Sequence, residues 1–143
     1  MNHSATCKSL FIVVILVMSM LLSETIVSGR KNPVQGEAQI IGVWTGESIC
    51  QVKNSPCKDE HASYRISKGK SAGKVTVDLG KIVNGKVESM VVLDFDYDAK
   101  SQTLISTYQH GVWKFTVKGN TLEGTLTTPE NIVYRKVSLK KAE

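Results

Sequence analysis

From residue 40 onward, apolar and polar residues alternate in short runs, the period-2 pattern of strands that bury one face. Turn-forming residues separate eight such runs, and helical periodicity is almost absent. The predicted strands cover residues 40–52, 61–68, 74–83, 86–97, 102–109, 112–118, 121–127 and 132–140. Because every connection between them is short, we expect consecutive strands to pair antiparallel.

The Gly119-Asn120 turn predicts a hairpin whose register can be worked out residue by residue. A two-residue loop places Lys118 opposite Thr121 and fixes the pairs beyond them. The resulting pairs are Val117 with Leu122, Phe115 with Gly124 and Trp113 with Leu126. All six side chains then share one face, so the turn and the apolar pattern agree.

The Asn84-Gly85 turn predicts a second hairpin, but this one needs an irregularity. Straight pairing from the turn would put Val91 on the same face as Asp78. A slip of one residue restores Leu79 as the neighbour of Val91. We therefore expect a β-bulge near Gly80-Lys81, where glycine tolerates the backbone geometry.

Eight antiparallel strands joined in order can bury their apolar faces as a sandwich or as a closed barrel. Closure removes exposed sheet edges, and eight strands leave an interior just wide enough for side chains or one small ligand. The sequence therefore predicts an all-β fold, an eight-stranded antiparallel up-and-down β-barrel within residues 40–143.

The segment ahead of the barrel has the pattern of a signal peptide. Lys8 precedes an apolar run from Leu10 to Leu22, and Val27-Ser28-Gly29 offers small side chains for cleavage. We expect residues 1–29 to be a signal peptide cut after Gly29. The alternative is an uncleaved membrane anchor, but Ser23-Glu24 ends the run short of the roughly 20 apolar residues that a span needs.

Residues 30–39 hold Pro33 and Gly36 and are otherwise mostly polar, which predicts a flexible leader in front of the barrel. Cleavage would leave one domain of modest size, with no room for a second. A signal peptide without a later apolar span predicts a secreted or periplasmic protein with no membrane span after cleavage.

The net charge of +5 favours contact with anionic surfaces in general. Cleavage would remove Lys8 and Glu24 together, so this excess stays in the barrel domain. The basic residues are scattered between a turn at residues 68–74 and the C-terminal residues 136–141, without interleaved aromatics. We therefore expect no nucleic-acid partner.

Two cysteines, Cys50 and Cys57, remain after cleavage. An even pair at short spacing in an oxidising compartment predicts a disulfide, which would pin the Asn54-Ser55-Pro56 turn to the end of the first strand. A zinc site that adds His61 is the alternative, but no fourth ligand is close in sequence. We expect no metal and no other cofactor.

Gly42-Val43-Trp44 opens the first strand, and Arg135 lies in the last strand on the same face as Val133 and Val137. An arginine with apolar neighbours at two-residue spacing points inward, where its charge needs a partner. The ring of Trp44 would supply one across the seam between the first and last strands.

This pairing resembles the calycins, the superfamily of lipocalins and fatty-acid-binding proteins, in which a Gly-x-Trp of the first strand meets a basic residue from the end of the barrel. The resemblance implies a lipocalin-like barrel that carries a small apolar or amphipathic ligand in its interior. The expected ligand-binding residues are Tyr64, Phe95, Trp113, Phe115 and Arg135. Val77, Leu93 and Leu126 would complete the lining, and Arg135 would face an acidic head group.

Two alternatives remain open for these residues. Trp44 and Arg135 have a structural role if they simply close one end of the barrel. A filled barrel would then act through its surface, as an interaction or inhibitor module. Interior volume separates the two, because a ligand site needs about 300 Å³ or more.

Catalytic and calcium sites find little support in the sequence. Asp94, Asp96 and Asp98 alternate along one face, but the glycine and glutamate of a calcium-binding EF-hand loop are missing. His61 and His110 lie beside predicted turns without a nucleophile near either in sequence. We therefore expect no catalytic residues and a protein that is not an enzyme.

Overall fold

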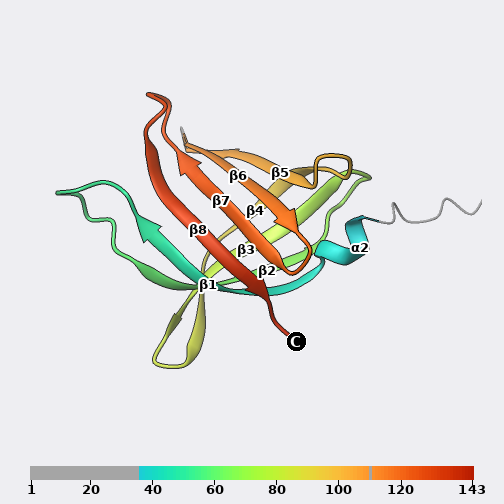
Figure 1. Cartoon of the computed structure of the whole chain (residues 1–143), viewed down its shortest axis with the longest axis horizontal. Coiled ribbons are helices and arrows are strands. Elements are labelled where there is room, and N and C mark those ends of the chain that lie inside the picture. The colour runs from blue at the N-terminus through green and yellow to red at the C-terminus, as the bar shows by residue number, and fades with distance from the viewer. Residues whose placement is uncertain (1–35, 110) are drawn as a thin grey trace, which may run out of the picture. The chain divides into compact units, whose positions relative to one another are not determined.

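Eight antiparallel strands follow one another around a closed barrel, and β8 returns to pair with β1 (Figure 1). The predicted fold class is confirmed. The computed structural model describes residues 36–109 and 111–143, so the predicted signal peptide, residues 1–29, lies outside the described residues. The strands are β1 Gly42–Cys50, β2 Glu60–Lys68, β3 Lys74–Val83, β4 Lys86–Asp98, β5 Thr103–Tyr108, β6 Gly111–Lys118, β7 Thr121–Thr127 and β8 Val133–Lys141.

The register of both predicted hairpins is confirmed. β6 and β7 pair Lys118 with Thr121 and Trp113 with Leu126, as the two-residue turn requires. Between β3 and β4, the register shifts after the pair of Leu79 with Val91. Gly80 pairs with Ser89, so the extra residue of the bulge is Met90 on β4.

Position 80 requires glycine because the backbones of β2 and β4 lie close to it on both sides. A Cβ atom there would lie 2.9 Å and 3.0 Å from carbonyl oxygens of β2 and β4. Such contacts with backbone atoms are too short for any side chain to be accommodated without moving a strand. The predicted position of the bulge thus has a steric basis.

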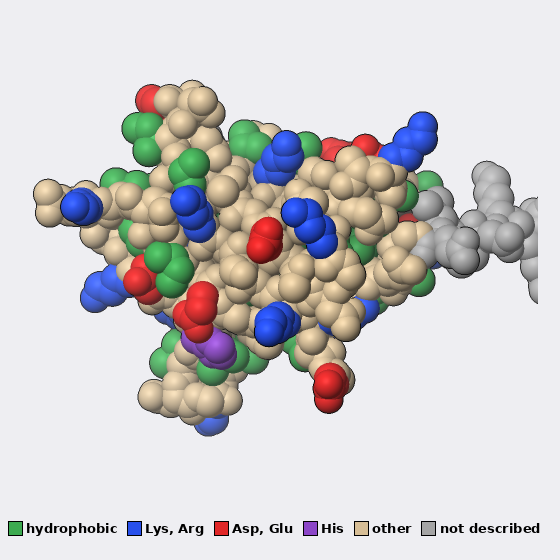
Figure 2. Space-filling view, viewed as in Figure 1, with side chains coloured by type: hydrophobic (Ala, Val, Ile, Leu, Met, Phe, Trp, Pro, Cys, Tyr) green, Lys and Arg blue, Asp and Glu red, His purple; other side chains and the backbone are tan. Residues whose placement is uncertain are grey.

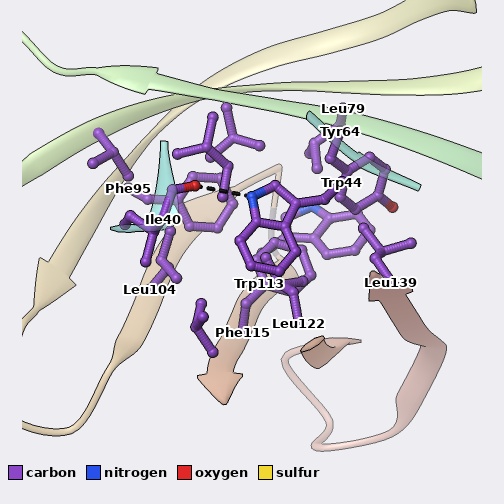
Figure 3. Packing of buried hydrophobic residues seen from close by; sticks show 14 of the residues in the cluster. Ile40, Trp44, Tyr64, Leu79, Phe95, Leu104, Trp113, Phe115, Leu122 and Leu139 are labelled. Carbon is purple, nitrogen blue, oxygen red and sulfur yellow. Dashed lines mark hydrogen bonds between the residues drawn. The ribbon is translucent and has the colours of Figure 1, made fainter. Parts of the chain in front are cut away.

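The inward faces of the strands fill the barrel interior with large side chains (Figure 3). Trp44, Tyr64, Phe95 and Phe115 are each at most 1% exposed. The ring of Phe115 lies at the centre of an aromatic cluster, with centroid distances of 5.5 Å to Phe95, 5.9 Å to Tyr64 and 5.6 Å to Trp113. These separations are typical of favourable aromatic pairs.

One end of the barrel is covered by a single helical turn, α2, which spans Glu37–Ile40. The last residues of the predicted flexible leader therefore form a helix instead. Ile40 is fully buried, and its carbonyl accepts a hydrogen bond of 2.9 Å from Nε1 of Trp44 (Figure 3). The indole N–H would otherwise be buried without a partner, which explains why this segment folds onto the barrel.

We call this covered end the closed end. Two further contacts hold the α2 segment there: the Tyr97 hydroxyl donates to the carbonyl of Gly36 at 3.1 Å, and Nζ of Lys141 donates to the carbonyl of Gln39. At the opposite, open end lie the connections β1–β2, β3–β4, β5–β6 and β7–β8, on the left in Figure 1.

The core packing predicts a steep cost for Gly124→Ala. A Cβ atom at Gly124 would overlap the carbonyl oxygen of Lys114 and the ring of Phe115, which pairs with Gly124 across β6 and β7. We expect a loss of about 3 kcal/mol in the free energy of unfolding, measured by urea denaturation. Gly119→Ala is the control, because it meets only open space and adds left-handed backbone strain of about 1 kcal/mol. Equal losses in the two variants would contradict the packing argument.

Candidate functional site

The expected contact between Trp44 and Arg135 is wrong. The register of β1 with β8 places Trp44 opposite Lys141 and Cys50 opposite Arg135, so the two residues lie about 20 Å apart along the strands. The alternation of apolar residues predicted the inward direction of Arg135 but not its height in the barrel. Nζ of Lys141 instead lies 5.7 Å from the centroid of the Trp44 ring.

The main apolar concavity among the described residues at the open end is a pocket of about 410 Å³, which we call the vestibule. Its walls include Val91 from β4, Trp113 from β6 and Leu126 from β7. Tyr108 and Tyr134, at the ends of β5 and β8, add aromatic surface. The vestibule is thus lined mainly by apolar groups, as small-molecule sites usually are.

A smaller cavity of about 200 Å³, which we call the recess, adjoins the vestibule further into the barrel. Val91 and Trp113 line both spaces, which places the two side by side. The recess differs from the vestibule because Glu60, Tyr64 and Arg135 contribute polar groups to its wall. The recess thus adds a few polar groups to a wall that is otherwise apolar.

The polar groups of the recess form one connected network around Arg135. Nη1 of Arg135 donates to Oγ of Ser48 at 2.8 Å and to its carbonyl at 3.2 Å, and lies 3.0 Å from Oε2 of Glu60. Nη2 donates to the carbonyl of Lys58 at 2.7 Å. The side chain of Ser48 also acts on the Tyr64 hydroxyl, whose pKa it lowers. The arginine, 9% exposed, thus has the partners that a buried charge requires.

The loop between β1 and β2 brings Lys58 and Glu60 to this network. Cys50 and Cys57 form the predicted disulfide, with their Cα atoms 5.8 Å apart. The backbone N–H of Cys50 also donates to Oδ1 of Asp59 at 2.8 Å. The disulfide shortens the path from the end of β1 back to β2, and disulfides are typical of oxidising compartments.

Burial raises the pKa of Tyr64 to about 12. The hydrogen bond with Ser48 and the positive charge of Arg135 oppose this rise, whereas the negative charge of Glu60 adds to it. The phenol therefore stays protonated well above neutral pH, where it both donates and accepts hydrogen bonds.

The five predicted ligand-binding residues divide into two groups. Trp113 lines the vestibule and the recess, and Tyr64 and Arg135 line the recess. Phe95 and Phe115, at 0% and 1% exposed, lie in the packed core and line neither space. Strand alternation indicates which face a side chain occupies, but it does not indicate depth along the barrel axis.

Sequence reasoning missed Glu60 and Ser48, the two side chains that contact Arg135 directly. Both are polar, and Ser48 lies on the inward face of β1 two residues before Cys50. The two-residue spacing from Trp44 through Gly46 to Ser48 was an available signal that a polar side chain shares the inward face of this strand.

The aspartates and the described histidine have ordinary surface partners. Asp96 pairs with Lys74, and Asp98 accepts hydrogen bonds from the following turn, where the Ser101 hydroxyl is the main cause of its lowered pKa. Nδ1 of His61 lies 2.9 Å from a carboxylate oxygen of Glu47 on the outer face. His110 lies outside the described residues. Within the described ranges, no group of three or more possible metal ligands is present.

The outer surface carries dispersed charges. On the face drawn in Figure 2, basic side chains stand apart from one another and acidic side chains lie between them. Among residues 36–109 and 111–143, no helix has the length and apolar character to cross a membrane.

No known protein family and no curated protein sequence matches this chain. The closed, eight-stranded antiparallel barrel is compatible with a calycin-like fold. The geometry of the open end therefore carries the functional argument.

The raised pKa of Tyr64 predicts alkaline sensitivity that Tyr64→Phe removes. The folded-state pKa of about 12 exceeds the ordinary value of 10.0, so the protonated Tyr64 phenol favours the folded state. This contribution to the free energy of unfolding is complete below pH 10 and is lost as the pH rises toward 12. At pH 11 the wild type should have lost about 1 kcal/mol from this group. Urea denaturation at pH 9 and pH 11 tests this, and an equal loss in both proteins would contradict it.

The network also predicts strong coupling between Arg135 and Glu60. Arg135→Gln leaves the Glu60 carboxylate, 20% exposed, without its partner and should lower the free energy of unfolding by about 2 kcal/mol. The double variant with Glu60→Gln should regain part of this loss, because no uncompensated charge remains. A double-mutant cycle by urea denaturation measures the coupling, and strictly additive losses would show that the pair does not act as a unit.

Proposed function

We propose that this protein is an exported, non-catalytic barrel that binds a small apolar or amphipathic ligand at its open end. The vestibule carries this proposal. Its volume of about 410 Å³ exceeds the lower size of small-molecule sites, about 300 Å³, and its walls are largely apolar. The adjoining recess adds a few fixed polar groups that would orient the ligand.

The bound ligand sits at the mouth of the barrel, not along its whole axis. Beneath the recess, Phe95, Phe115 and Trp44 fill the interior at 0–1% exposure. A binding mode at the mouth leaves this core undisturbed, which favours a short or compact ligand over a long extended one.

Four observations support kinship with the calycins, export and a binding role. The barrel has the strand number and topology of that superfamily, and the basic Lys141, at the end of the last strand, meets the Trp44 ring. The Cys50–Cys57 disulfide favours an oxidising environment, and so a secreted or periplasmic location. His61 pairs with Glu47 outside the barrel, away from the vestibule, which favours a binding role over catalysis.

A surface interaction module is the second candidate. A groove of about 460 Å³ crosses the outer faces of β1, β6, β7 and β8. Its walls carry Glu47, Glu123, Lys118 and Lys136, a mixture of charges that suits a polar protein surface. This candidate needs no ligand in the vestibule, so ligand binding distinguishes the two.

Val91→Glu should abolish binding of an apolar ligand, because it places a carboxylate in the wall shared by the vestibule and the recess. N-phenyl-1-naphthylamine, whose fluorescence rises in apolar surroundings, is the probe. We expect the wild type to bind it with saturation and Val91→Glu to bind at least about tenfold more weakly.

Val92→Glu is the matched control, since Val92 is the next residue on β4 and is 56% exposed on the outer face. This variant should bind the probe as the wild type does. Equal weakening in both variants, or no saturable binding to the wild type, would contradict the proposed site and favour the surface module.

A further inference from the structure

The recess contains one positive and one negative group in direct contact. Nη1 of Arg135 lies 3.0 Å from Oε2 of Glu60, and both side chains line the cavity. The Tyr64 hydroxyl, the third polar group of the recess wall, carries no charge at neutral pH. The polar groups of the recess wall are therefore close to neutral overall, and the rest of the wall is apolar.

We propose that the recess selects an uncharged polar head group, a hydroxyl or an amide, on an otherwise apolar ligand. This inference rests on the proposed function and specifies its ligand class. It also revises the expectation that Arg135 faces an acidic head group, because Glu60 already occupies that side of the guanidinium.

A charged head group gains little in this recess. A carboxylate that approaches Arg135 also approaches the Glu60 carboxylate 3.0 Å away, and an ammonium that approaches Glu60 meets the guanidinium. Each charged group must also give up its hydration to enter a cavity walled partly by Leu79, Val91 and Trp113. Attraction and repulsion nearly cancel, so the cost of desolvation decides against both ions.

A hydroxyl or amide matches the available hydrogen-bonding groups. The guanidinium has five N–H donors, and its contacts with Ser48, Lys58 and Glu60 leave donor capacity within the described part of the chain. The carboxylate of Glu60 accepts hydrogen bonds, so one head group that both donates and accepts engages both members of the pair. Its desolvation cost is far smaller than that of an ion.

The sizes of the two spaces fix the orientation of such a ligand. The recess, at about 200 Å³, holds a head group and the first carbons of a chain. The rest of the chain extends past Trp113 and Val91 into the vestibule, where Leu126 and Tyr134 cover it. The polar end thus points inward and the apolar end lies near the mouth.

Three ligands of equal chain length test the selection at pH 7.5: decanol below its solubility limit, and decanoate and decylamine below their critical micelle concentrations. Each competes with N-phenyl-1-naphthylamine for the wild-type protein. We expect decanol to displace the probe at about tenfold lower concentration than either ion. A wild type that prefers decanoate or decylamine overturns the inference.

Two variants shift the charge of the recess in opposite directions. Glu60→Gln leaves Arg135 uncompensated and should raise the affinity for decanoate about tenfold, whereas Arg135→Gln should do the same for decylamine. Retained probe binding shows that a variant is folded. If a variant does not fold, the order of the three ligands on the wild-type protein still tests the inference. Unchanged rankings in folded variants overturn the inference, whereas a wild type that binds neither probe nor ligand overturns the proposed function itself.

Discussion

The ion pair of Arg135 with Glu60 is the interaction on which the open end depends. A buried guanidinium is costly unless its donors are satisfied, and here Ser48, Lys58 and Glu60 share that role. Their positions come from four elements: β8 carries the arginine, β1 the serine, the disulfide-linked loop the lysine carbonyl, and the start of β2 the glutamate. The network therefore ties the seam of the barrel to the β1–β2 loop and fixes the polar wall of the recess.

The interior of the barrel is shielded differently at its two ends. At the closed end, α2 covers Trp44 and accepts its N–H, so apolar packing and one hydrogen bond suffice. Among residues 36–109 and 111–143, no element covers the interior at the open end, where the charged network lies instead. Within the described residues, β4 pairs with β5 over three residue pairs, so the β4 backbone around Val91 has no strand partner on that side, and the Val91 side chain lines the vestibule. The packed closed end gives rigidity, and the open end gives binding space.

Much of the fold follows from local patterns in the sequence. The Gly119-Asn120 turn and the apolar face of its strands set the register, and the conflict between Asp78 and Val91 revealed the bulge. The site is harder to predict from the sequence, because alternation gives the face on which a residue lies but not its position along the barrel axis. Arg135 was assigned to the wrong partner for this reason, and Phe95 and Phe115 were placed in a pocket that lies above them. The partners of Arg135 come from β1, the start of β2 and the loop between them, all distant in sequence, which no local pattern reports.

The central claim is that a ligand enters the open end and contacts the recess. An NMR titration of ¹⁵N-labelled protein with decanol tests this most directly, because each backbone amide reports its own surroundings. The account predicts saturable shifts at Val91, Trp113 and Leu126, with Ile40 and Trp44 at the closed end unchanged. Shifts confined to the closed end or to the outer faces of the strands, or no saturable shifts at all, would contradict it.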